Sequence, residues 1–222
     1  MLILDLSKMC EKNGKNMGII TSLSLQKNKT RANIYLDGKF VCGLDNETIV
    51  KNRLKVGEEI SSESLEKMQL ESEVNKAFEK ALSLIERQLY SKKQLEIKLK
   101  EKGYLPETIN IALNKLAEYG YLNDALFAQN YASVSKNKSR KEIKYKLMQK
   151  GINANTIDEV VNKIDTETER DNAVAIAEKY MRRKENTKEN INKLFAYLIG
   201  KGFAIDDAKF AIKKYNKEID YD

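Results

Sequence analysis

The sequence predicts a mainly α-helical protein: three tandem three-helix repeats in an elongated, curved array, preceded by a small N-terminal β-hairpin or three-stranded sheet. Three observations support this fold class. From about residue 73 onward, apolar residues recur at intervals of three and four, and proline occurs once in the whole chain. A pattern of apolar residues and glycines repeats along that helical part. Before it, residues 19–42 show the alternation and the turn signal of short strands.

A β-rich segment is expected over residues 17–72, and its clearest signal is a hairpin. An Asp37-Gly38 pair separates short apolar runs at 32–36 and 39–42. Asp-Gly between two such runs predicts a hairpin, because a type I′ turn needs positive φ at both central positions. Together with the alternating run that precedes it, this hairpin should form a three-stranded sheet.

The rest of the N-terminal segment has weaker signals. A short helix is expected from Asp45, followed by a connector over 55–60 and by an N-cap at Ser61 or Ser62. Residues 1–16 fit neither the sheet nor a helix, so they are expected to be an N-terminal extension or arm. Met1 and Met17 are both candidate natural starts.

Three copies of one helical unit are expected over residues 73–122, 123–166 and 167–222. Each copy should hold three helices, at 73–89, 91–102 and 106–119; at 123–137, 139–150 and 154–164; and at 167–184, 187–201 and 205–216. The alignment rests on a recurring set: Leu95, Leu99, Lys102, Gly103, Ile109, Leu113 and Leu116; then Ile143, Leu147, Lys150, Gly151, Ile157, Val161 and Ile164; then Leu194, Leu198, Lys201, Gly202, Ala208, Ile212 and Tyr215.

Helix ends are marked in each copy. The Lys-Gly pair should end the middle helix, since a C′ glycine adopts the left-handed conformation and a lysine favours the negative end of the helix dipole. Ser91, Ser139 and Thr187 stand before the middle helices as expected N-caps. A unit of about 48 residues buries little by itself, so consecutive units should pack in series.

Composition excludes most catalytic chemistry. The chain has no His, which removes Ser-His and Cys-His pairs, imidazole bases and His-ligated zinc. Cys10 and Cys42 show neither zinc spacing nor a disulfide framework, which predicts a reducing, cytoplasmic setting. No run approaches the roughly 18 apolar residues of a membrane helix, and the Asn123-Asp124 pair is expected to cap a helix. We therefore expect neither an enzyme nor a metal, cofactor or membrane partner.

The net charge of +7 is concentrated in three windows, each of which spans the start of a middle helix. The strongest window, 136–150, holds seven basic residues and one acidic residue, and the others cover 90–102 and 179–193. Stacked repeats would bring these windows near one face, and a basic face suits a polyanion, although solvated lysines are the simpler alternative. The expected contact residues are Lys92, Lys93, Arg140, Lys141, Lys144, Arg182, Arg183 and Lys188.

Three tyrosines accompany these windows: Tyr90, Tyr145 and Tyr180. Aromatic rings beside basic residues can stack on the bases of a single strand. Tyrosine at helical spacing more often packs half-buried, so both roles stay open.

Several motifs resemble those of one known family. They are Ser91-Lys92-Lys93-Gln94-Leu95 with the later Lys102-Gly103, Gly120-Tyr121-Leu122-Asn123-Asp124 with Phe127-Ala128 and Tyr131, Ile143 with Leu147 and Lys150-Gly151-Ile152, and the closing Leu198-Ile199-Gly200-Lys201-Gly202-Phe203. Over about residues 73–216 the chain resembles RecX, the regulatory protein of the RecA recombinase. The N-terminal hairpin segment is similar to the extension of the longer members. One departure is that Arg87 lies one position from the family's usual place for an arginine before the opening serine.

The resemblance implies a non-enzymatic modulator. Such a protein binds RecA, lies along the helical groove of its filament on single-stranded DNA, and blocks or destabilises strand exchange and coprotease activity. Two other functions fit the basic helices: a DNA-binding module that acts directly on single- or double-stranded DNA, and a helical scaffold for another partner. No long heptad requires a dimer, so a monomer is expected.

Overall fold

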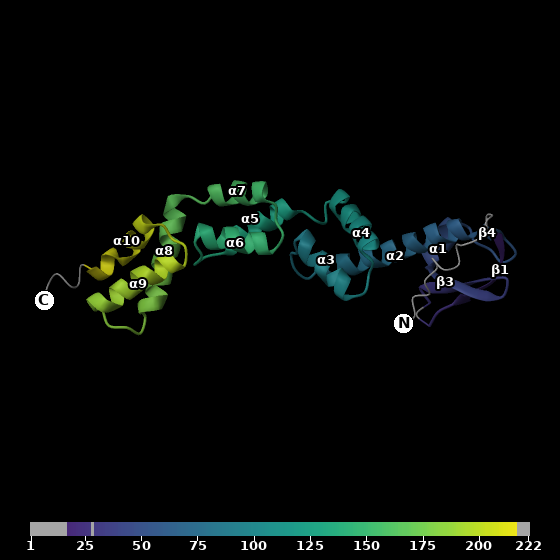
Figure 1. Ribbon diagram of the computed structural model, residues 1–222, viewed down its shortest axis with the longest axis horizontal. Coiled ribbons are helices and arrows are strands. Elements are labelled where there is room, and N and C mark those ends of the chain that lie inside the picture. Colours follow the sequence, from purple (N-terminus) through teal and green to yellow (C-terminus); the bar gives the residue numbers. More distant parts are fainter. Residues whose placement is uncertain (1–16, 28, 217–222) are drawn as a thin grey trace. The chain divides into compact units, whose positions relative to one another are not determined.

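The structure, a computed structural model, describes residues 17–27 and 29–216 (Figure 1). The extension expected at residues 1–16 lies outside the described residues. The chain divides into two compact units, which are described separately: residues 17–80 with Lys102–Ala112, and Ala81–Glu101 with the described chain from Leu113 onward. Within the described residues, no helix has the length and apolar character needed to cross a membrane.

The N-terminal unit contains a four-stranded antiparallel sheet in the order β3-β2-β1-β4. Its strands are β1 (Met17–Leu25), β2 (Arg31–Leu36), β3 (Lys39–Asp45) and β4 (Glu59–Ser61). The expected hairpin is confirmed, because Asp37 and Gly38 join β2 to β3 with φ angles of +47° and +78°.

The expectation of three strands is corrected by β4. Residues 55–60 are expected to be a connector, but Glu59–Ser61 pairs with residues 17–19 of β1. A strand of three residues is too short to display a period of two, so its sequence carries no usable signal. Its central residue, Ile60, is buried in a core that also contains Ile20, Ile34 and Leu44.

Two helices continue from this sheet. The first, α1 (Asn46–Lys51), is capped as expected by Asp45, whose side chain accepts a hydrogen bond from the Thr48 N–H. The second, α2 (Ser62–Ile85), follows Ser61, whose Oγ accepts a hydrogen bond from the Ser64 N–H at 3.2 Å. The first repeat helix, expected at 73–89, is therefore the second half of a longer helix that is continuous across the proposed domain boundary at residue 72.

Three-helix repeats occupy the chain from the second half of α2 onward, which confirms the mainly helical fold class. Each repeat has a first, a middle and a last helix. After α2, the bounds are α3 (Lys92–Glu101) and α4 (Pro106–Glu118); α5 (Asp124–Val134), α6 (Arg140–Gln149) and α7 (Ala154–Asn162); and α8 (Thr166–Met181), α9 (Lys188–Gly200) and α10 (Ile205–Asn216). In Figure 1 the helices of the third repeat, α8 to α10, lie together at the end of the described chain.

Burial confirms the alignment of the repeats. The equivalent positions of the middle helices are fully buried in all three copies: Leu95, Leu99, Ile143, Leu147, Leu194 and Leu198. The second repeat gathers its core around Phe127, Ile143 and Ile157, and the third around Ala173, Leu194 and Ala208. Each middle helix therefore turns one apolar stripe inward and leaves its charged side toward solvent.

Candidate functional site

The middle helices α3, α6 and α9 carry the basic windows, and a repeated contact joins each to the next along the chain. The Ser91 hydroxyl donates a hydrogen bond to the Lys150 carbonyl oxygen at 2.6 Å. The Ser139 hydroxyl donates to the Lys201 carbonyl oxygen at 2.7 Å. Each serine also accepts a bond from an N–H of its own helix, as expected for an N-cap. One hydroxyl thus satisfies the start of one middle helix and the end of the next.

A carboxylate completes each of these junctions. The Lys92 N–H donates to Asp124 Oδ1 at 2.8 Å, and the Arg140 N–H donates to both Oε atoms of Glu169 at 3.1 Å. Both acids belong to the first helix of the following repeat. A carboxylate at the N-terminal end of a helix satisfies an orphan donor and favours the positive end of the dipole.

Gly151 and Gly202 lie at these junctions, where little or no room is left for a Cβ atom. Gly151 has a φ of +78°, and a Cβ atom at this position would lie 2.4 Å from the Lys93 Cβ. A Cβ at Gly202 would lie 3.0 Å from both the Lys141 Cβ and the Ser139 Oγ. The Lys-Gly pair thus ends its own helix and also leaves room for the preceding repeat.

The Asn123-Asp124 pair connects helix capping to the first junction. The Asn123 Oδ1 accepts a hydrogen bond from the Leu126 N–H, which confirms the expected cap of α5. Asp124, the next residue, accepts from the Lys92 N–H as described above. Gly120, with a φ of +75°, ends the preceding helix. Three residues of the 120–124 motif, Gly120, Asn123 and Asp124, therefore have structural roles in or beside the connection between α4 and α5.

Arg140 and Glu169 are the most enclosed charged groups of the second junction. The Arg140 side chain is half-buried, and its Nη2 donates to the Ile164 carbonyl oxygen. Glu169 is buried, and that burial raises the pKa of its carboxyl group above the usual range, although the bonds from the Arg140 N–H act in the opposite direction. Arg140, which is expected to be a contact residue, therefore has its guanidinium engaged inside the protein.

The other expected contact residues on α3 and α6 are exposed, but most have partners. The Lys92 Nζ donates to Asn114 Oδ1 at 3.0 Å, and the Lys93 Nζ pairs with Glu96 at 3.0 Å. The Lys144 Nζ pairs with Asp158 at 2.6 Å. Lys141 is exposed on the same side of α6 as Lys144. Exposed ion pairs of this kind contribute little free energy, so these lysines remain available to a partner.

In the third repeat the expected contact residues are Arg182, Arg183 and Lys188, and all three are exposed. Arg182 and Arg183 directly follow α8, and Lys188 is the first residue of α9. Near them, the rings of Tyr180 and Tyr197 lie 4.9 Å apart between centroids. The Lys184 Nζ lies 3.1 Å from the centre of the Tyr180 ring, and the Lys201 Nζ lies 5.6 Å from that of Tyr197. We call Tyr180, Lys184, Tyr197 and Lys201 the tyrosine–lysine cluster.

The three tyrosines that accompany the basic windows differ in their surroundings. Tyr180 packs against the core of the third repeat. Tyr90 is half-buried, with the Lys98 Nζ 5.9 Å from its ring centre. Tyr145 is exposed on α6. Packing therefore accounts for Tyr180 and in part for Tyr90, but not for Tyr145.

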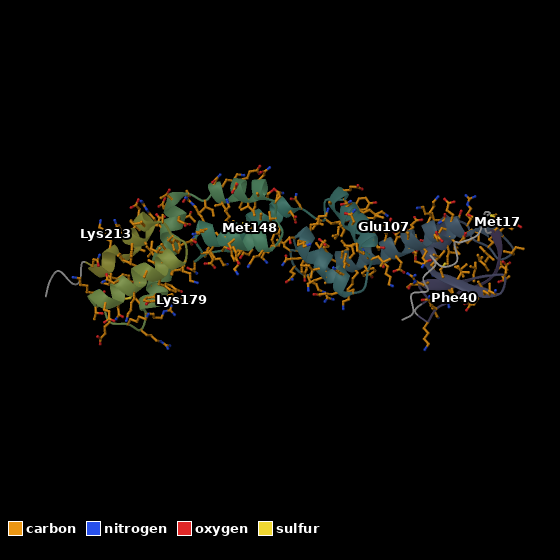
Figure 2. All side chains as sticks on the ribbon, in the orientation of Figure 1. Met17, Phe40, Glu107, Met148, Lys179 and Lys213 are labelled. Carbon is orange, nitrogen blue, oxygen red and sulfur yellow. The ribbon has the colours of Figure 1, made fainter. Side chains whose placement is uncertain are left out.

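The same helices expose a set of apolar side chains, of which the sequence pattern pointed only to Tyr145. Ile97, Tyr145, Met148 and Ile199 are 47%, 57%, 59% and 38% exposed. Each lies either six or three residues before the glycine of its Lys-Gly pair. Figure 2 marks Met148 on α6. The repeat alignment was the signal that could have found this set, since it places the four residues at only two equivalent positions.

A sheet domain followed by three-helix repeats, with basic and apolar groups on the exposed sides of the middle helices, defines a helical-repeat protein. Among the described residues, no cluster of carboxylate or thiol side chains has the arrangement of a metal site.

Comparison with known proteins identifies the family. The family model described as "Regulatory protein RecX N-terminal domain" matches residues 18–61, and those described as the first and second three-helix domains of RecX match 77–116 and 123–161. The chain is 35% identical over 204 residues to "Regulatory protein RecX" of Clostridium botulinum (strain Alaska E43 / Type E3), with 89% of this chain and 96% of the relative covered. To the protein of the same name from Bacillus subtilis (strain 168) it is 34% identical, with 93% and 80% covered.

Solved structures agree with this assignment. A "Crystal structure of regulatory protein RecX" matches with a TM-score of 0.71 and 26% identity, over 88% of this chain and 99% of that one. The "Crystal structure of RecX from Lactobacillus salivarius" matches with a TM-score of 0.57 and 26% identity, over 65% and 97%. The chain belongs to the RecX family of non-enzymatic regulatory proteins.

Proposed function

We propose that this chain regulates the RecA recombinase by binding its filament on single-stranded DNA, and that it mostly inhibits the recombinase, ATPase and coprotease activities. Membership of the RecX family is the observation that carries this proposal. Three repeats with similar exposed helices offer several weak contacts to a partner that is itself repetitive. Linked weak contacts raise the overall affinity well above that of any one of them.

The expected basic residues supply the electrostatic part of this contact. Lys92, Lys93, Lys141 and Lys144 are exposed on α3 and α6, and Arg182, Arg183 and Lys188 are exposed in the third repeat. Arg140 acts from within the second junction, where it holds the start of α6. Cationic groups in this number would steer the protein to acidic filament surfaces or to DNA phosphates, and salt would weaken the association.

The decisive test is the single-stranded-DNA-dependent ATP hydrolysis of the cognate recombinase, titrated with this protein at two salt concentrations. We expect inhibition well below one protein per recombinase protomer, because a filament-directed inhibitor affects more than the protomer it touches. The inhibition should weaken at the higher salt concentration. Unchanged hydrolysis at equimolar protein would overturn the proposal.

Direct binding of single-stranded nucleic acid is a second candidate function, and the exposed Tyr197 ring of the tyrosine–lysine cluster, with Lys201 beside it, favours it. Tyrosine rings beside ammonium groups are a combination that binds bases and phosphates without sequence preference. Fluorescence anisotropy with a labelled oligonucleotide and no recombinase measures this binding. Tight binding to bare DNA together with unchanged ATP hydrolysis would favour this function over the first.

We propose further that the protein acts as a monomer in the cytoplasm. The reducing setting is supported by the sequence, whose two cysteines lack the spacing of a disulfide framework. Light scattering coupled to size-exclusion chromatography tests the oligomeric state. A mass near 25.5 kDa is expected for the monomer.

A further inference from the structure

The exposed apolar set consists of Ile97, Tyr145, Met148 and Ile199, and its members on α6 and α9 do not belong to the described cores of the second and third repeats. On α3, Ile97 lies between the buried Leu95 and Leu99, and on α6, Tyr145 lies between the buried Ile143 and Leu147. A residue two positions from a buried one is turned roughly 200° around a helix axis, so these side chains project away from the core. Single exposed apolar residues are ordinary. Here, however, each of two equivalent positions holds an exposed large apolar residue in two of the three repeats.

Lysines flank this set along the helix surface. On α6, Lys141 precedes Tyr145 by four residues, and Lys144 precedes Met148 by four. On α3, Lys93 precedes Ile97 by the same interval. Residues four apart are neighbours on a helix surface. Each apolar side chain on α3 and α6 therefore has an ammonium group beside it.

This combination favours a protein partner over nucleic acid or a bilayer. Ile97, Met148 and Ile199 have neither an aromatic ring that could stack on a base nor a strong hydrogen-bonding group for a phosphate. Their burial is therefore favourable only against an apolar surface. A bilayer requires a broad apolar face, whereas these helices present one or two apolar side chains among lysines. Apolar centres with a charged rim are the usual arrangement of a protein–protein interface, where methionine and tyrosine are enriched.

We propose that the middle helices bind equivalent protein surfaces, one on each of several copies of the same partner protomer. Each helix inserts its part of the exposed apolar set into a small apolar hollow that is rimmed by acidic side chains: Ile97 from α3, Tyr145 and Met148 from α6, and Ile199 from α9. The positive charge of α3 and α6 supplies the complement to that rim. The inference rests on the proposed function in one respect: the partner protomer is that of the recombinase filament.

The test uses the full chain with Tyr145→Ser and Met148→Ser combined. A second variant, Leu126→Ser with Val134→Ser, removes two exposed apolar side chains from α5 of the same repeat and is the matched control. Circular dichroism and thermal melting check that both variants fold. Affinity for the recombinase filament on labelled single-stranded DNA should fall about 10- to 100-fold for the α6 variant and less than about 2-fold for the control.

Salt dependence separates the apolar contribution from the electrostatic one. The α6 variant should keep the wild-type slope of affinity against salt, because it removes no charge. Equal filament affinity of the α6 variant and the control would overturn the inference, while wild-type inhibition would leave the proposed function standing. An equal loss of affinity for the bare oligonucleotide would also overturn it and assign the face to nucleic acid. A wild-type protein that does not bind the filament would overturn both.

Discussion

Two separate constraints favour glycine at position 151: its positive φ angle and the close approach of the Lys93 side chain. Its φ of +78° requires the left-handed region, which the sequence pattern predicts from the Lys-Gly ending of a helix. The close approach of the Lys93 Cβ is a separate constraint that involves a residue of the preceding repeat. Gly103 occupies the equivalent position of the first repeat with a φ of +87°, yet a Cβ there would meet nothing within 4 Å. The two glycines therefore differ only in tertiary surroundings.

Gly151→Ala should lower the free energy of unfolding by about 2–4 kcal/mol, since it combines left-handed strain with an overlap against Lys93. Gly103→Ala is the matched control and should cost about 1 kcal/mol, from the backbone strain alone. Urea denaturation followed by circular dichroism measures both. Equal costs for the two substitutions would contradict the close approach.

Glu169 makes stability depend on pH in a direction opposite to most surface acids. Because burial raises its pKa in the folded state above the ordinary 4.5, the folded protein binds a proton that the unfolded chain has already released. The stabilisation from this protonation is complete below pH 4.5 and is lost as the pH rises through the raised value. The Glu169→Gln substitution should therefore lower the free energy of unfolding, relative to wild type, by less at pH 7 than at pH 4.

Parallel urea titrations at pH 4 and pH 7 measure this difference. Glu167→Gln on the same helix serves as the control, since Glu167 is exposed and its loss leaves the junction intact. A wild-type-to-variant difference in unfolding free energy that is the same at both pH values would show that Glu169 does not titrate differently in the folded protein.

At the scale of elements, capping was predictable and pairing between distant elements was not. Asp45, Asn123, Ser139 and Thr187 all cap helices at positions that their sequence patterns indicate. A cap is a contact within three residues, so the local sequence contains both of its partners. By contrast, β4 is defined by a partner strand about 40 residues away in the sequence, and its own three residues have no distinguishing period.

Ser139→Ala removes both an N-cap and the bond to the Lys201 carbonyl oxygen, so it should destabilise the protein by about 2–3 kcal/mol. Thr187→Ala removes the corresponding cap of α9, where the threonine accepts from the Asn190 N–H but is exposed, and should cost about 1 kcal/mol. Thermal and urea unfolding give both values. A Ser139 variant that costs no more than the Thr187 variant would mean that the bond across the junction contributes nothing.

For the whole molecule, the distribution of charge along the chain should affect association with an acidic partner more than the total net charge does. The net charge is only +7, yet residues 136–150 alone contain seven basic residues and one acidic residue. Concentrated charge raises the local potential and speeds encounter with an acidic surface, and added salt suppresses the effect. The position of a lysine should therefore decide its effect on filament binding.

Lys141→Glu with Lys144→Glu should weaken inhibition of the recombinase ATPase by about 10-fold or more at low salt and by less at high salt. Lys209→Glu with Lys213→Glu, two exposed positions on α10, changes the net charge by the same amount and is the matched control. The concentration for half-maximal inhibition is the quantity to compare. Equal weakening by both pairs would assign the effect to net charge and remove the special role of α6.

The helical repeats, the hairpin, the helix caps and the family were predictable from the amino-acid sequence, because each depends on residues that lie close together in the chain or on motifs at fixed spacing. Packing between distant parts of the chain determines which side chains remain exposed on the middle helices, and it brings Arg140 to the Ile164 carbonyl oxygen and Ser91 to the Lys150 carbonyl oxygen. Those contacts join residues 24 to 59 positions apart. Their free energy depends on how helices pack against one another, and no local period or cap encodes that packing.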